Sequence, residues 1–253
     1  VIKDEQVYGG QSAFTRKLEH EGGPPTITKD TMRIHQTKAQ AARDADAEEL
    51  GSLTADAVGL RAPTVIRLDR TKVEMEFLEG KPGGGTIAEI PRGTVFEETD
   101  DGRLMGLLDY LTGNPDRSDR NWLLLPNGRM ASIDMGDAFR TPKLAGTRDN
   151  FGSSLMTDED GKLRKLVDFN PADLAVIRAR LEALRPEFER LGRATWHKQV
   201  MTRLADVEKR ATGTTIRLPE ARADLTSITS RAAQRAESAR NLRHSVVGCR
   251  IGS

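Results

Sequence analysis

One cysteine, Cys249, is the entire thiol content of this 253-residue chain, so an internal disulfide framework is excluded. Neither sign of charge is in excess, because 39 Lys and Arg stand against 38 Asp and Glu, and this gives no electrostatic case for a dedicated nucleic-acid binder. No apolar run approaches the roughly 20 residues of a membrane-spanning helix. The opening residues, VIKDEQVYGG, lack the basic and apolar regions of a signal peptide. A soluble, cytoplasmic protein is therefore expected.

The length allows one large domain or two small lobes, and the first part of the chain has a predominantly β pattern. Short strands broken by Gly-Gly pairs are predicted within residues 7–30. Residues 40–58 are predicted to form a helix that ends at Gly59, because apolar residues recur on one face. Two further strands are expected in PTVIRL, residues 63–68, and in KVEMEFLEG, residues 72–80, where apolar residues alternate with glutamates.

After a loop rich in Gly and Pro, the sequence becomes mainly helical. A stripe with i, i+3, i+4, i+7 spacing predicts a helix that ends at Gly113. This stripe consists of Leu104, Leu107, Leu108 and Leu111. Asn170 and Pro171 are typical of a helix N-cap and first turn, Pro186 begins another helical piece, and residues 196–207 form an amphipathic helix. The carboxyl-terminal part is expected to be mostly α-helical.

The stretch LTGNPDRSDRNWLLLPNGRMASIDMGDAF, residues 111–139, carries the strongest functional pattern. An apolar run, a Pro-Asn-Gly turn and a second apolar run predict a β-hairpin. Because the open end of a hairpin brings its strand ends together, we expect Asp116, Asn121 and Asp134 to converge. Hard oxygen ligands of this kind suit Mg²⁺, which takes one or two carboxylates together with waters and substrate phosphates. The cluster therefore predicts phosphate chemistry.

The spacing resembles that of protein kinases, in which a D-x-x-x-x-N loop precedes D-F-G; here the residues are Asp116, Asn121 and then Asp134 in D-M-G. More specifically, GNPDRSDRNWLL and IDMGDAF resemble the G-N-x-D-R-x-x-x-N and I-D-x-G patterns of atypical kinases, the group of phosphatidylinositol kinases, actin-fragmin kinase and HipA-type toxin kinases. The resemblance covers roughly residues 7–140. It implies an α+β, two-lobed protein-kinase-like fold, with a small β-rich N-lobe and a mostly helical C-lobe.

The resemblance also implies ATP and Mg²⁺ as cofactors. Asp116 would orient the attacking hydroxyl and accept its proton, while Asn121 and Asp134 would hold Mg²⁺ against the phosphates. Lys29 would be the strand lysine, paired with Glu49 of the predicted helix or with Glu48, because a one-residue helix rotation is not resolved by the pattern. The expected glycine-rich turn consists of Gly9, Gly10, Gln11 and Ser12. The expected adenine-binding hinge consists of Glu76, Phe77 and Leu78.

Two departures from the kinase pattern affect the expected mechanism. The H-R-D position reads N-P-D here, ending at Asp116, so activation through a phosphorylated loop is not expected. The lysine two residues after the catalytic aspartate is replaced by Ser118, and Arg117 or Arg120 is therefore expected to face the transferring phosphate. Residues 140–162 read as a variable loop where a substrate could dock.

Plainer interpretations exist for each of these residues. Asp and Asn beside Pro and Gly are common in solvated turns, Lys29 could be a surface lysine at a strand end, and Glu48 and Glu49 could be solvated helix acids. The four histidines have no metal-ligand spacing. The order of the motifs along one chain favours the kinase interpretation, since motif context is what confirms a motif.

The expected domains are an N-lobe of residues 1–80, a helical C-lobe of residues 81–215 and a basic arm of residues 216–253. The arm is either a surface helix or a loosely attached segment that is autophosphorylated or binds a partner. Its candidate phosphorylation sites are Ser227, Ser230, Ser238 and Ser245. The expected function is kinase activity toward a hydroxyl, foremost Ser or Thr of a protein. A small-molecule or phosphoinositide kinase and a catalytically silent nucleotide-binding scaffold are the alternatives.

Overall fold

Two compact units make up the part of the chain that the structure, a computed structural model, describes. The described residues are 1, 3–6, 15–33, 35–83, 99–140 and 169–211. As far as they are described, residues 1–45 and 64–77 form the first unit, and residues 46–63 and 78–211 form the second. None of the described helices combines the length and the apolar character that a membrane crossing requires.

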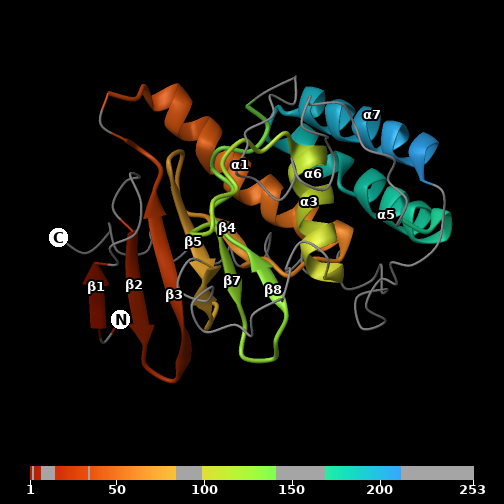
Figure 1. Ribbon diagram of the computed structural model, residues 1–253. Coiled ribbons are helices and arrows are strands. Elements are labelled where there is room, and N and C mark those ends of the chain that lie inside the picture. The colour runs from red at the N-terminus through yellow and green to blue at the C-terminus, as the bar shows by residue number, and fades with distance from the viewer. Residues whose placement is uncertain (2, 7–14, 34, 84–98, 141–168, 212–253) are drawn as a thin grey trace. The chain divides into compact units, whose positions relative to one another are not determined.

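The first unit is built on a five-stranded antiparallel sheet (Figure 1). In spatial order its strands are β1 (Lys3–Gln6), β2 (Thr15–His20), β3 (Gly23–Asp30), β5 (Lys72–Glu76) and β4 (Val65–Arg67). The register pairs Lys29 of the central strand β3 with Thr15 on one side and Val73 on the other. Gly22, with φ of 68°, turns the chain between β2 and β3, a left-handed conformation that glycine adopts without steric cost.

Helix α1 spans Lys38–Val58, and its residues up to Ala45 belong to the first unit. Ala45 packs against Val65 and Val73 of the sheet. The helix ends at Gly59, as the sequence predicts, because this glycine has φ of 89°. Its N–H and that of the next residue donate to carbonyls of the last helical turn, at 3.1 Å and 3.0 Å, in a Schellman cap.

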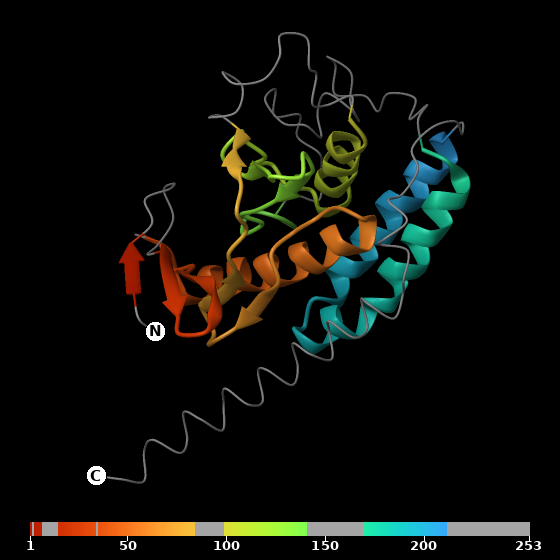
Figure 2. The same cartoon turned by 90° about the horizontal axis from the view of Figure 1, so that it is seen from below.

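The second unit contains the remaining helices and a small antiparallel sheet. Its elements, besides residues 46–58 of α1, are β6 (Lys81–Pro82), α3 (Asp100–Thr112), β7 (Trp122–Leu124), β8 (Met130–Ser132), α5 (Pro171–Ala183), α6 (Arg185–Arg190) and α7 (Ala194–Arg210). The sheet has the order β6-β7-β8. Figure 2 shows α5 and α7 side by side, and α7 also packs against α3 and α6.

Helix α3 forms the centre of the apolar core in the second unit. It begins after Thr99, whose Oγ1 accepts the N–H of Gly102 at 3.0 Å, and ends at Gly113, with φ of 60°. Its predicted leucine stripe is fully buried, and burial of each such side chain contributes about 1.5–3 kcal/mol relative to exposure. Apolar side chains of α5 and α7 are also buried. They include Leu174, Ile177, Leu181, Val200 and Leu204.

These elements confirm the expected α+β class, with a β-rich amino-terminal sheet and a mostly helical carboxyl-terminal part. Two strands were not expected. Strand β1 precedes the Gly-Gly pair, and β6 lies within the predicted loop, where it pairs with β7. Gly83 allows this approach, because a Cβ at that position would overlap the ring of Trp122.

The division between the units lies close to the expected lobe boundary at residue 80, since it falls between residues 77 and 78. Residues 46–63 belong to the second unit although the sequence places them in the N-lobe. The expected arm, residues 216–253, and most of the expected docking loop, residues 140–162, lie outside the described residues.

Candidate active site

The predicted hairpin brings Asn121 and the segment of Asp134 together at its open end. Strands β7 and β8 pair Trp122 with Ser132, and the N–H of Ile133 donates to the carbonyl of Asn121 at 3.1 Å. The turn at the other end closes at Gly128, whose φ is 75°. Ile133 therefore lies opposite Asn121, and Asp134 is the next residue after Ile133. The hairpin thus brings Asp134 close to Asn121, as expected.

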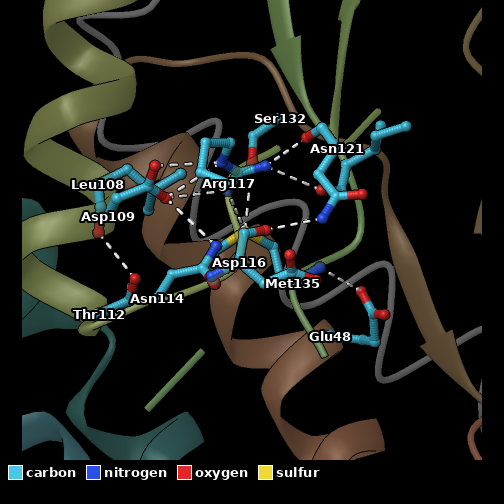
Figure 3. Close-up of polar contacts among 11 residues, drawn as sticks. Glu48, Leu108, Asp109, Thr112, Asn114, Asp116, Arg117, Asn121, Ser132 and Met135 are labelled. Carbon is cyan, nitrogen blue, oxygen red and sulfur yellow. Dashed lines mark hydrogen bonds and ion pairs between the residues drawn. The ribbon is translucent and has the colours of Figure 1, made fainter. Parts of the chain in front are cut away.

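The side-chain amide of Asn121 has a fixed orientation. Its Nδ2 donates to the backbone carbonyl of Asp116 at 2.7 Å (Figure 3). A carbonyl only accepts, so the nitrogen and not the oxygen of the amide must face Asp116. Within the described part of the chain, Asn121 Oδ1 makes no hydrogen bond, and the Asp116 carboxylate, which is exposed, makes neither a hydrogen bond nor an ion pair.

Asp134 has an unusual backbone conformation. Its φ is 54°, in the left-handed region, which aspartate tolerates better than most residues but still at some cost in free energy. Gly136, two residues later, lies between two acids: a Cβ there would stand 3.2 Å from Oε1 of Glu48 and 3.8 Å from Oδ1 of Asp134. The carboxylates of Glu48 and Asp134 thus border the same small space. No group of three His, Cys, Asp or Glu side chains suited to a metal occurs among the described residues.

Arg117 does not face a substrate position, in contrast to the expectation. Its side chain is fully buried, and each of its five N–H groups has an acceptor. Nε donates to the carboxylate of Asp109 at 3.2 Å, and Nη2 donates one of its hydrogens to the same carboxylate at 3.0 Å. The other hydrogen of Nη2 points to Sδ of Met135. Nη1 donates to the carbonyls of Asn121 and Ile133, the latter at 2.9 Å.

No N–H of Arg117 is therefore left for a phosphate, and the expected role as the cation facing it is wrong. Its alternative, Arg120, is exposed and has no hydrogen bond or ion pair within the described part of the chain. Of the two candidates, only Arg120 is available to a bound anion.

Asp109, on the last turn of α3, is a buried acid that the sequence does not predict as a site residue. Burial raises the pKa of its carboxyl group, and the charge of Arg117 opposes this shift. Nδ2 of Asn114 adds a longer hydrogen bond at 3.3 Å. The only available signal was one acid within the apolar run LMGLLDYL, a position where a carboxylate must be buried and therefore paired.

The two glutamates of α1 have different partners. Oε2 of Glu48 accepts the N–H of Met135 at 2.9 Å, whereas Glu49 forms an ion pair with Arg190 of α6. Both are buried, with 2% and 6% of their surface exposed, so neither is a solvated helix acid. One turn earlier, Asp46 pairs with Arg193 at 2.8 Å. Within the second unit, Glu48 is therefore the acid that contacts the D-x-G segment.

The expected nucleotide-binding residues of the first unit are partly described. Lys29 lies in the middle of the sheet and is 5% exposed, so it is not a surface lysine. The N–H of Glu76 donates to Thr64 at 2.9 Å and the N–H of Phe77 donates to Pro25 at 3.3 Å, so both are already used by the unit's own backbone. Leu78, which follows in the second unit, makes no described backbone hydrogen bond. The expected glycine-rich turn, residues 9–12, lies outside the described residues.

Comparison with known proteins gives a structural likeness but no family. No protein-family model matches the sequence, and no curated protein matches it. Among solved structures, the chain is similar to the Rio2 kinase of Chaetomium thermophilum, in a crystal structure of its complex with ADP/Mg²⁺ and phosphoaspartate. The two are 13% identical, with a TM-score of 0.39, over 97% of this chain and 71% of that chain. A likeness at this level does not assign the chain to a family.

Proposed function

We propose that this protein is a kinase that transfers the γ-phosphoryl group of ATP to a hydroxyl, with Mg²⁺ as the metal. The proposal rests foremost on one observation: Asn121 turns its amide nitrogen to the Asp116 carbonyl, which leaves its oxygen for a cation beside the chain segment of Asp134. A solvated turn has no need of this arrangement, since either end of an exposed amide is hydrated equally well.

The donor set fits Mg²⁺ rather than a fully protein-bound metal. One carboxylate from Asp134 and one amide oxygen from Asn121 leave most of an octahedral shell for waters and phosphate oxygens, as is usual for this ion. When bound, ATP supplies the phosphoryl group and Mg²⁺ neutralises charge on its phosphates. In the first unit, Lys29 of the central strand β3 is the proposed phosphate ligand, because the resemblance to kinases places the strand lysine at this position.

Asp116 would act on the phosphate acceptor. Its exposed carboxylate would accept a hydrogen bond from the attacking hydroxyl and take its proton, while the γ-phosphoryl group passes to that oxygen and ADP is the leaving group. The carbonyl of the same residue is held by Asn121, so the base and the metal ligand keep a fixed relation. Arg120, two positions before Trp122, the first paired residue of β7, is the proposed cation for the transferring phosphate. The proposed acceptor is a Ser or Thr hydroxyl of a protein.

The decisive experiment compares Asp116→Asn with Asp119→Asn. Both acids are exposed and lie in the same loop, but only Asp116 carries a proposed role, so Asp119→Asn controls for loss of a loop charge. Each variant and the wild type are incubated with γ-labelled ATP and Mg²⁺ in three mixtures: alone, with lysate protein, and with vesicles that contain phosphoinositides. We expect labelled polypeptide with the wild type and with Asp119→Asn. With Asp116→Asn, we expect the amount of labelled polypeptide to fall by about 10²-fold or more.

Label in lipid would replace the protein acceptor with a phosphoinositide while leaving the phosphotransferase proposal intact. Nucleotide binding without any transfer, together with no effect of Asp116→Asn, would select the silent scaffold. Equal loss of label in both variants would show that the loop charge matters and that Asp116 is not the base.

A further inference from the structure

Two chain segments that carry the proposed metal ligands are joined by one guanidinium. Nη1 of Arg117 donates to the carbonyl of Asn121 (Figure 3). It also donates to the carbonyl of Ile133, the residue before Asp134. These carbonyls belong to the residues next to the last pair of β7 and β8, where one further backbone hydrogen bond, from the N–H of Ile133 to the carbonyl of Asn121 at 3.1 Å, joins the two strands. The two hydrogens of Nη1, which lie in one plane, connect the same two residues a second time and limit how far the segments can move apart.

The guanidinium is itself held by a rigid support. Asp109 belongs to the last turn of α3, the helix with the fully buried leucine stripe, and it orients Arg117 through Nε and Nη2. The carbonyl of Asp109 also accepts the N–H of Asn114 at 3.0 Å, which fixes the start of the loop that carries Asp116. From α7, Arg203 donates to the carbonyl of Leu111 at 2.9 Å, so the end of α3 is fixed on a second side.

A contribution to stability alone would not account for this arrangement. Buried ion pairs are weak evidence for stability, because well-packed apolar residues of similar volume often replace them at no loss. Apolar residues cannot replace the planar guanidinium, which hydrogen bonds to two carbonyls, a carboxylate and a sulfur at once.

We propose that Arg117, held by Asp109, is the positioning residue that sets the distance between Asn121 and Asp134, and thereby the affinity of the site for Mg²⁺. The metal part of this inference rests on the proposed function. The positioning part concerns the chain alone and is testable without any activity.

Two changes separate positioning from folding. Arg117→Lys keeps the positive charge beside Asp109 but loses the fork, whereas Asp109→Leu combined with Arg117→Met replaces the pair by apolar side chains. The matched control is Arg178→Met, which removes an arginine–carboxylate pair with Glu208 between α5 and α7, away from the hairpin. The free energy of unfolding in urea is measured for all three, so that global loss of stability is recognised.

The first measurement is amide hydrogen exchange. Ile133 donates to Asn121 and Met135 donates to Glu48, so their two N–H groups report on the segment before and after Asp134. We expect exchange to be about 10-fold faster at both in Arg117→Lys and in the double variant, with amides of α3 unchanged relative to global stability. Arg178→Met should leave both amides at the wild-type rate.

The second measurement is the Mg²⁺ concentration that gives half-maximal phosphoryl transfer. Residues that orient metal ligands typically change metal affinity by about 10–100-fold, so we expect this midpoint to rise at least about 10-fold in Arg117→Lys and to stay unchanged in Arg178→Met. If a positive charge beside Asp109 were sufficient, Arg117→Lys would keep the wild-type Mg²⁺ midpoint.

The outcomes are distinct. Faster exchange together with a raised Mg²⁺ midpoint supports the proposal, and unchanged exchange overturns it. Faster exchange with a wild-type midpoint also overturns it, because Arg117 would then hold the segments without controlling the metal. If the wild type transfers no phosphate while exchange at Ile133 and Met135 is faster in the variants, the proposed function fails and the positioning of the two segments by Arg117 stands.

Discussion

The N–H of Met135 donates to Oε2 of Glu48 at 2.9 Å, which joins the middle of the D-x-G segment to helix α1. One turn along the same helix face, Gly51 receives the Met135 side chain: a Cβ at Gly51 would lie 2.6 Å from Cβ of Met135. Residues i and i+3 of a helix are neighbours on its surface, so the two contacts act together. Glu48, Gly51 and Met135 all belong to the second unit. Their contacts therefore fix the position of the D-x-G segment, and with it Asp134, against residues 46–58 of α1.

Glu48→Ala should therefore impair the reaction more than Glu49→Ala. Loss of Glu48 leaves the Met135 N–H without its acceptor and lets the D-x-G segment shift, and misplacement of about 1 Å lowers rates by about 10²-fold. Glu49 pairs with the half-exposed Arg190, so its loss should lower the free energy of unfolding by about 1 kcal/mol or less, with a smaller effect on the rate. Steady-state kcat/KM and urea unfolding of both variants test this. A larger kinetic effect of Glu49→Ala would contradict it.

Gly51→Ala tests the close contact between α1 and Met135. Replacing glycine by alanine inside a helix ordinarily stabilises it by about 1 kcal/mol. Here the added methyl group would overlap Met135, so we expect destabilisation by about 1–3 kcal/mol instead. The sign of the change in unfolding free energy decides the matter, and a gain in stability would show that Met135 does not pack against this position.

Features with local signals were predicted from the sequence, and those that depend on several distant acceptors were not. Gly59 and Gly113 ended helices where expected because a left-handed residue after an apolar stripe is a local signal. The hairpin followed from its Pro-Asn-Gly turn, and it gave the approach of Asn121 to the segment of Asp134.

The sequence predicts the wrong role for Arg117, because its acceptors come from α3, from both strands at the open end of the hairpin and from Met135, and no sequence spacing encodes such a set. Glu48 and Glu49 were not separable for a different reason. Adjacent helical residues differ by about 100° in direction, and errors of one residue in a predicted helix phase are ordinary. The contacts of Met135 and Arg190 are what distinguish them.

The pH dependence of stability should report the buried pair of Asp109 and Arg117. Burial raises the folded-state pKa of Asp109 above its unfolded value of about 3.9, so the native state binds the proton more tightly. This contribution is fully present below the unfolded pKa and is lost as pH rises through the folded pKa. The unfolding free energy of the wild type relative to Asp109→Asn should therefore fall with rising pH across that acidic window.

The same pair gives a second arm for this measurement. In Arg117→Met the charge that opposes the shift is gone, so the pKa of Asp109 rises further and the window extends to higher pH. We expect Arg117→Met to be more stable in mildly acidic than in neutral buffer, as measured by urea unfolding. A stability difference that does not vary with pH in either variant would show that Asp109 is ionised without penalty.

Asn121→Asp separates the two roles of the proposed metal ligand. If only oxygen ligation and charge mattered, a carboxylate would bind Mg²⁺ at least as well as an amide. The structure favours the opposite result, because Nδ2 of Asn121 donates to the Asp116 carbonyl and an ionised carboxylate has no hydrogen to donate. Two acceptors would then face each other, and the side chain and the Asp116 loop would move apart. We expect kcat to fall about 10²-fold and not to recover at saturating Mg²⁺. Full activity at high Mg²⁺ would show that the amide hydrogen bond is dispensable and that Asn121 serves as a ligand alone.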